Sequence, residues 1–251
     1  MFTVQVEQPS LKMPMRHQSA EEQLQDYKAK MGDELGTVFH HCRQNFLNIT
    51  VLWDEFVTLF GIPERVALMN EAGSRLAHDI FWQFLNGVTL GITRLLDPPE
   101  TGKFRNLTLA RLGELCPQSI STEVGRQLAE IENSSVTFRA LRDKIIAHND
   151  VDHAMGRAQT LQYASRRDIT VVLKKILELL NTIDFHFTKS ITHIMPMGNR
   201  HAFDHLLSLH RGALIKKEVL ASLSSHDLSL ANKYDWPEFL IETEEERNRY
   251  R

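Results

Sequence analysis

The sequence predicts an all-α fold, a helical bundle with about seven helices. Glycine and proline are scarce, with 12 and 8 residues in a chain of 251. So few turn residues favour long helices with short connections and argue against a many-stranded sandwich or barrel. Apolar residues recur at three- and four-residue steps along most of the chain. Strand-like alternation is confined to residues 2–6, so the fold should be built from helices.

Composition and charge limit the class of protein. We expect a flexible N-terminal tail (residues 1–18), one helical domain (19–222) and a polar C-terminal tail (223–251). The 29 Lys and Arg residues against 32 Asp and Glu residues give a net charge of −3. This balance removes the simplest electrostatic case for an obligate nucleic-acid binder, but a local basic site is still compatible with it.

The cysteines and the apolar runs bear on location. Cys42 and Cys116 are the only cysteines, so a disulfide framework is not expected and a reducing cytoplasm fits the sequence. The longest uncharged apolar run, residues 80–93, is shorter than the roughly 20 residues that a membrane span needs. We therefore expect a cytoplasmic protein without a membrane partner.

The N-terminal half should begin with two helices. Ser19 and Glu22 have the spacing of a capping box, in which a hydroxyl and a carboxylate satisfy the first backbone amides of a helix. Apolar residues then recur at helical steps over residues 35–60, and Gly61 ends that stretch. Pro63 suits the first position of a third helix, because its missing amide hydrogen is not needed there.

The third helix should break near residues 70–73 and end at Asp97. Pro98 and Pro99 follow Asp97, and the residue before a proline is disfavoured in the helical region. Arg94 lies three residues before Asp97 at the helix end, where it can pair with Asp97 or bond the last carbonyls of the helix. We expect Asp97 to fix the turn and the Arg94–Asp97 pair to be structural.

The C-terminal half continues the helical pattern. Further helices are predicted over residues 107–115, 121–146, 165–187 and 202–219. Residues 133–135 (Asn-Ser-Ser) either interrupt the second of these or lie on its solvent face, and Ser165 with Asp168 gives another capping box. The periodicity predicts one core that includes Phe39, Phe46, Trp53, Phe84, Leu141, Ile145 and Ile176.

Several common signatures are missing from the sequence. There is no glycine-rich phosphate loop, no nucleophile elbow and no His-Glu-x-x-His pair. His201 and His205 have the four-residue spacing of zinc ligands, but no third ligand can be assigned to them. We therefore predict no metal and no cofactor.

Residues 141–150 (LRDKIIAHND) form the segment most suited to chemistry. Arg142 carries a guanidinium that can hold a phosphate in bidentate fashion, and the pKa typical of His148 suits proton transfer at neutral pH. On a regular α-helix the two side chains point roughly 120° apart. A two-fold dimer would solve this problem by bringing two arginines and two histidines to one cleft.

The same segment resembles the Arg-x(4–6)-His motif of HEPN domains. RDKIIAHND is similar to the form found in the abortive-infection branch, the U-type phage-abortive-infection proteins. GITRLLDPPETGKFRNLTLARL resembles the Arg-Leu-x-Asp-Pro turn and the following Asn-Leu-x-Leu helix of that branch. The resemblance covers roughly residues 35 to 215 and implies a HEPN-like helical bundle.

The resemblance also implies an activity, because active HEPN domains are metal-independent endoribonucleases with a site between two protomers. Arg142, His148 and Asp143 would be catalytic, while Asn149 and Lys144 would contact the RNA substrate. The expected partners are RNA, a second copy of the chain, and an antitoxin or nucleotidyltransferase.

Other interpretations stay open at this point. A non-catalytic HEPN-like module would use the same surface to bind a nucleotide or a partner protein, and a regulator or antitoxin-like scaffold would bind no ligand there. Without the resemblance, Arg142 and Asp143 would be read as surface charges. His148 would then belong to a polar helix end, where the helix dipole favours histidine.

Overall fold

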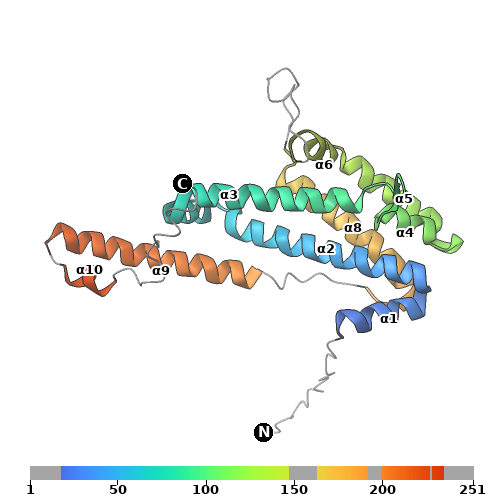
Figure 1. Cartoon of the computed structure of the whole chain (residues 1–251), viewed down its shortest axis with the longest axis horizontal. Coiled ribbons are helices and arrows are strands. Elements are labelled where there is room, and N and C mark those ends of the chain that lie inside the picture. The colour runs from blue at the N-terminus through green and yellow to red at the C-terminus, as the bar shows by residue number, and fades with distance from the viewer. Residues whose placement is uncertain (1–17, 147–162, 192–198, 227, 235–251) are drawn as a thin grey trace, which may run out of the picture. The chain divides into compact units, whose positions relative to one another are not determined.

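The structure, a computed structural model, describes residues 18–146, 163–191, 199–226 and 228–234. Within these ranges the chain is helical apart from one small hairpin (Figure 1), so the all-α fold class is confirmed. The elements are α1 (Ala20–Met31), α2 (Asp33–Phe60), α3 (Pro63–Leu95), β1 (Glu100–Thr101), β2 (Phe104–Arg105), α4 (Leu109–Leu115), α5 (Gln118–Ser134), α6 (Val136–Leu141), the π-helical turn η1 (Arg142–Ile146), α8 (Arg166–Thr188), α9 (Asn199–Ser224) and α10 (Ser229–Lys233).

Both predicted capping boxes are present. The backbone amide of Glu22 donates to Ser19 Oγ at 3.2 Å, and the Ser19 amide donates to Glu22 Oε2 at 2.8 Å. Asp168 and Ser165 exchange the equivalent hydrogen bonds at 3.2 and 2.9 Å. Each box satisfies backbone amides that have no partner inside the helix, which explains why α1 and α8 begin where they do.

The boundary between the two longest helices, and the break inside the second of them, also agree with the prediction. α2 ends at Phe60, directly before Gly61, and α3 begins at Pro63. Inside α3 the backbone leaves the helical region at Gly73, with φ 174° and ψ 91°, which is the predicted break.

Three local features differ from the prediction. The loop after α3 holds a two-stranded antiparallel hairpin, in which Glu100 pairs with Arg105 and Gly102 adopts a positive φ of 60°. α5 starts at Gln118 rather than near residue 121, because Pro117 supplies an extended cap. The helix predicted over residues 121–146 is interrupted at Ser135, which is one of the two predicted alternatives, but it ends in the π-helical turn η1, which was not predicted.

The chain divides into two compact units. Unit 1 comprises residues 1–47 and 90–193, and unit 2 comprises residues 48–89 and 194–251. The predicted core residues are shared between them. Phe39, Phe46, Leu141 and Ile176 are buried in unit 1, and Trp53 is buried in unit 2. Phe84 is only half-buried, and the side chain of Ile145 lies outside the described residues.

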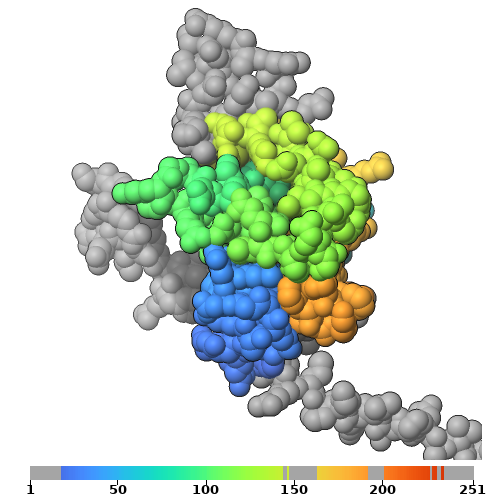
Figure 2. All heavy atoms as spheres, turned by 90° about the vertical axis from the view of Figure 1, so that its right-hand side faces the viewer, coloured from blue at the N-terminus to red at the C-terminus, as the bar shows by residue number. Residues whose placement is uncertain are grey.

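In unit 1, α8 packs antiparallel along α5 and also contacts α1. Lys175 donates to Ser134 Oγ at 2.8 Å, and Gln127 donates to Thr182 Oγ1 at 3.0 Å. Figure 2 shows the face where α1 (blue), the α4–α5 region (green) and the end of α8 (orange) gather. Glu34, at the start of α2, accepts hydrogen bonds from Arg105 of β2 and Arg111 of α4 and so joins α2 to this part of unit 1.

In unit 2, aromatic rings fill the space between α2 and α3. The ring of Phe81 lies 5.1 Å from that of Phe56 and 5.3 Å from that of Phe60, between ring centroids. Trp53 stacks on Phe56 at 5.3 Å. Such edge and stacked contacts add to the free energy gained by burying apolar area.

No single helix in the described ranges is both long and apolar enough to cross a membrane. Only α2 and α3 taken together, with an 84° bend between them, reach the required length and hydrophobicity.

Candidate active site

The candidate active site is built on the segment that follows α5. The Ser135 hydroxyl donates to the Ile131 carbonyl at 2.6 Å, which satisfies a buried polar group at the break between α5 and α6. Phe138 and Leu141 are buried and anchor α6 in unit 1. η1 then carries Arg142 and Asp143 on a π-helical turn, a form of helix that is rare and frequent at functional sites.

The guanidinium of Arg142 is held between two carboxylates. Its Nε donates to Asp143 Oδ1 at 2.8 Å, and its Nη1 donates to Asp97 Oδ1. The hydrogen bond that Arg142 donates to Asp143 raises the pKa of Arg142 above its ordinary value, and the hydrogen bond to Asp97 is the next largest cause. The side chain therefore stays charged. With 26% of its side-chain surface exposed, Arg142 is positioned by protein groups but still reaches solvent.

Asp97 belongs to the turn after α3, and a second arginine contacts the same turn. Arg139 Nη2 donates to the Leu96 carbonyl at 3.0 Å. Leu96 is itself buried. α6 and η1 are therefore joined to two consecutive residues of the turn by charge-assisted hydrogen bonds, which are stronger than neutral ones.

This arrangement corrects the predicted Arg94–Asp97 pair. The Asp97 carboxylate pairs with Arg142, 45 positions away, and within the described residues the structure gives Arg94 no ion pair. Arg94 is exposed at the last turn of α3. The sequence predicts for Asp97 only the local role of fixing the turn, whereas the structure places it in the candidate site. Its position directly before Pro98 is the sequence feature that marks it.

Only part of the predicted site can be placed. Arg142 and Asp143 are described and contact each other. The backbone of Lys144 lies in η1, but its side chain lies outside the described residues, as do all atoms of His148 and Asn149. The 120° separation predicted for Arg142 and His148 assumed a regular α-helix, and η1 departs from that geometry.

The histidine pair on α9 does not form a cluster of ligands. His201 and His205 are both exposed. Among the described side chains, no three His, Cys, Asp or Glu residues lie together as they would around a metal ion.

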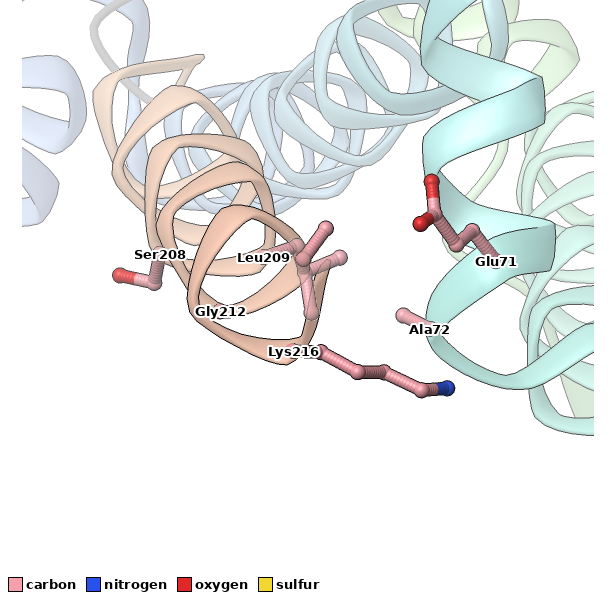
Figure 3. Close-up of a pocket in the computed structure, with 7 residues that line it drawn as sticks. Glu71, Ala72, Ser208, Leu209, Gly212 and Lys216 are labelled. Carbon is pink, nitrogen blue, oxygen red and sulfur yellow. The ribbon is translucent and has the colours of Figure 1, made fainter. Parts of the chain in front are cut away.

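Unit 2 contains a hollow between α3 and α9, with an open volume of about 480 Å³. Figure 3 shows Glu71 and Ala72 of α3 facing Leu209 and Lys216 of α9, while Ser208 points away. Ala213 and Gly212 complete the lining. The hollow has one carboxylate and one ammonium group but no histidine or arginine, and it suits no reaction that the sequence predicts.

Comparison with known protein families identifies the family of the chain. The sequence matches the AbiU2 family of HEPN domains over residues 32–213, a range that includes Asp97, Arg142 and Asp143. No curated protein and no solved structure shows detectable similarity to the chain. The match covers well over half of the chain, and the protein therefore belongs to the AbiU2 family, an abortive-infection family of the HEPN superfamily.

Proposed function

We propose that the protein is a metal-independent endoribonuclease that acts as the effector of a phage-defence or toxin–antitoxin system. The observation that carries this proposal is the environment of Arg142. Its guanidinium is held by two carboxylates on a π-helical turn, at the first position of the Arg-x(5)-His motif of a HEPN family. A pre-positioned arginine can stabilise the charge that develops on a phosphate in the transition state.

The reaction is attack of an RNA 2′-hydroxyl on the adjacent phosphorus. The oxygen–phosphorus bond that forms closes a 2′,3′-cyclic phosphate, and the bond to the 5′-oxygen of the next nucleotide breaks. His148 removes the 2′-hydroxyl proton, and a second His148 from a two-fold partner protonates the leaving oxygen. Arg142 binds the non-bridging oxygens, Asp143 orients Arg142, and Lys144 and Asn149 bind the RNA next to the cleaved bond.

The test is cleavage of a mixed RNA pool in excess chelator, with identification of the product ends. We expect cyclic-phosphate and 5′-hydroxyl ends from the wild type, none from His148→Ala, and severely impaired cleavage by Arg142→Lys, because an ammonium cannot reproduce the bidentate contact. Arg111→Lys is the matched control for the arginine, since Arg111 also lies between two carboxylates, Glu34 and Glu114, at 2.5 and 2.8 Å. Activity that disappears with chelator, or a His148→Ala variant that cleaves like the wild type, would disprove the mechanism.

One observation favours a second candidate, a non-catalytic module that binds a nucleotide or a partner protein. Asp97 and Asp143 already balance the charge of Arg142, so a phosphate must compete with them for the guanidinium. Wild-type protein that binds nucleotides in calorimetry but leaves RNA intact would support this candidate over the nuclease.

The proposal includes protein partners. A toxin-like nuclease needs an inhibitor, and we propose an antitoxin or a nucleotidyltransferase in that role. Co-expression with such an inhibitor should then relieve growth inhibition by the wild type. His148→Ala should not inhibit growth with or without that inhibitor.

A further inference from the structure

We propose that Asp97 is a positioning residue for the reaction, which holds the Arg142 guanidinium in the orientation that a phosphate requires. The inference rests on the proposed nuclease function and adds a residue from outside the sequence motif. Asp97 is not proposed to touch the substrate, since it acts through Arg142.

Asp97 occupies a fixed place in unit 1. Leu95 and Leu96, directly before it, are buried in unit 1. Directly after it, Asn106 Nδ2 donates to the Pro98 carbonyl at 2.8 Å and the Asn106 amide donates to the Pro99 carbonyl at 2.8 Å. The backbone is therefore fixed on both sides of Asp97, by the two buried leucines before it and by the hydrogen-bonded proline turn after it.

Two hydrogen bonds, not one, connect the turn after α3 to the segment of the motif. Arg139 binds the Leu96 carbonyl and Arg142 binds the Asp97 carboxylate. Residues three apart lie on the same side of a helix, so one side of α6 and η1 meets two successive residues of the turn. This pairing fixes how η1 is rotated relative to the end of α3.

The Arg142 guanidinium is held at two of its nitrogens. A contact at one nitrogen leaves an arginine free to swing about that contact, whereas contacts at two nitrogens fix the plane of the group. Asp143 binds Nε and Asp97 binds Nη1. Asp143 is adjacent in the chain and moves with η1, so Asp97 is the partner that ties Arg142 to the rest of unit 1.

The experiment compares Asp97→Asn with Glu114→Gln. Both changes remove one carboxylate from an arginine that has two, but Arg111 and Glu114 belong to α4 and not to the motif. For Asp97→Asn we expect kcat to fall roughly 10- to 100-fold, since small misplacements of a catalytic group have effects of that size. We expect KM to change little, and Glu114→Gln to keep wild-type kinetics.

A second readout does not depend on activity. The Nε–H resonance of Arg142 in a ¹⁵N spectrum is assigned by its loss in Arg142→Lys. It should shift and broaden in Asp97→Asn and stay unchanged in Glu114→Gln. An Asp97→Asn variant with wild-type kcat and an unchanged resonance would overturn the proposal.

The outcomes separate this inference from the proposed function. If the wild type cleaves no RNA, the nuclease proposal fails, and the resonance alone then decides whether Asp97 orders Arg142. If Asp97→Asn does not fold, Asp97→Glu decides, because it keeps the charge but displaces the carboxylate by one methylene. A lower kcat at an unchanged melting temperature supports positioning, and a wild-type kcat contradicts it.

Discussion

Arg142 and Asp97 form an ion pair across 45 positions of the chain. The pair joins the Asp-Pro-Pro turn after α3 to the first residue of the motif helix. Both features lie within the range matched to the AbiU2 family. Two stretches that look independent along the chain are thus parts of one structural feature in unit 1.

Phe46→Ala should destabilise the protein strongly. Phe46 is 1% exposed in unit 1, and truncating a buried aromatic residue costs about 3–5 kcal/mol of unfolding free energy. Urea unfolding followed by circular dichroism measures the change. Phe104→Ala is the control, because Phe104 is 65% exposed in β2 and its loss should leave the midpoint almost unchanged.

Ser165→Ala should lower the free energy of unfolding by about 1 kcal/mol, the usual cost of losing an N-cap. The Ser165 hydroxyl accepts from the Asp168 amide, and Asp168 accepts in return. Ser190→Ala, at an exposed position beyond the C-terminal end of α8, should have a smaller effect. Equal stability of the two variants in thermal unfolding would show that the cap contributes nothing.

His40 should make stability depend on pH on the acid side of neutrality. Its side chain is 4% exposed and its Nδ1 has no hydrogen-bond partner among the described residues. Burial above all, then the nearby His41 and Arg43, lower the pKa of His40. As the pH falls below about 6.5, His40 is protonated in the unfolded chain but stays neutral in the folded protein. The free energy of unfolding therefore decreases with falling pH until the pKa of His40 in the folded protein is reached.

His40→Gln removes this titration. The variant should show a shallower loss of stability than the wild type when urea unfolding is repeated between pH 7 and pH 5. His205→Gln, at an exposed position of α9, should follow the wild-type curve. Parallel curves for wild type and His40→Gln would contradict the prediction.

The two cysteines should react with thiol reagents at different rates. Cys42 is buried, and burial raises its pKa to about 12. Cys116 is half-buried, with its pKa raised to about 11. Because the thiolate is the reactive form, both should react slowly in the native state, and Cys116 first. Alkylation followed by peptide mass spectrometry measures the order, and equal rates in urea confirm that folding causes the difference.

The protein should be a homodimer whose interface includes the helix with Arg142 and His148, since the proposed reaction uses one histidine from each protomer. Light scattering at micromolar concentration should give twice the chain mass of 28.9 kDa. A single species at the chain mass would remove the composite site from the mechanism.

Many helix boundaries of the fold were predictable because the residues that determine them lie next to each other in the sequence. The Ser19–Glu22 box, the stop at Gly61 and the start at Pro63 each depend on residues within one turn of the helix end. The hairpin at residues 100–105 was missed, since its strands have only two residues each and give no alternating pattern.

The site was less predictable because its key contact is not local. The chemistry of the guanidinium and the resemblance to HEPN domains marked Arg142 as a functional candidate, but the nearest arginine to Asp97 in sequence, Arg94, was taken as its partner. Which arginine reaches Asp97 depends on how α6 packs against the end of α3, and no pattern along the chain contains that information. The π-helical turn η1 was not predicted either, because the apolar spacing was read as that of a regular α-helix.

The π-helical turn affects how relatives of this protein should be aligned. A turn with hydrogen bonds from residue i to i+5 accommodates one residue more than an α-helical turn. Along the chain, η1 therefore places this extra residue in the segment between Arg142 and the histidine of the motif. The number of positions between Arg142 and His148 is then a poor guide to their separation in space. In an alignment of relatives, a one-residue insertion in this segment should be treated as a change between α-helical and π-helical turns, and not as a loss of the motif.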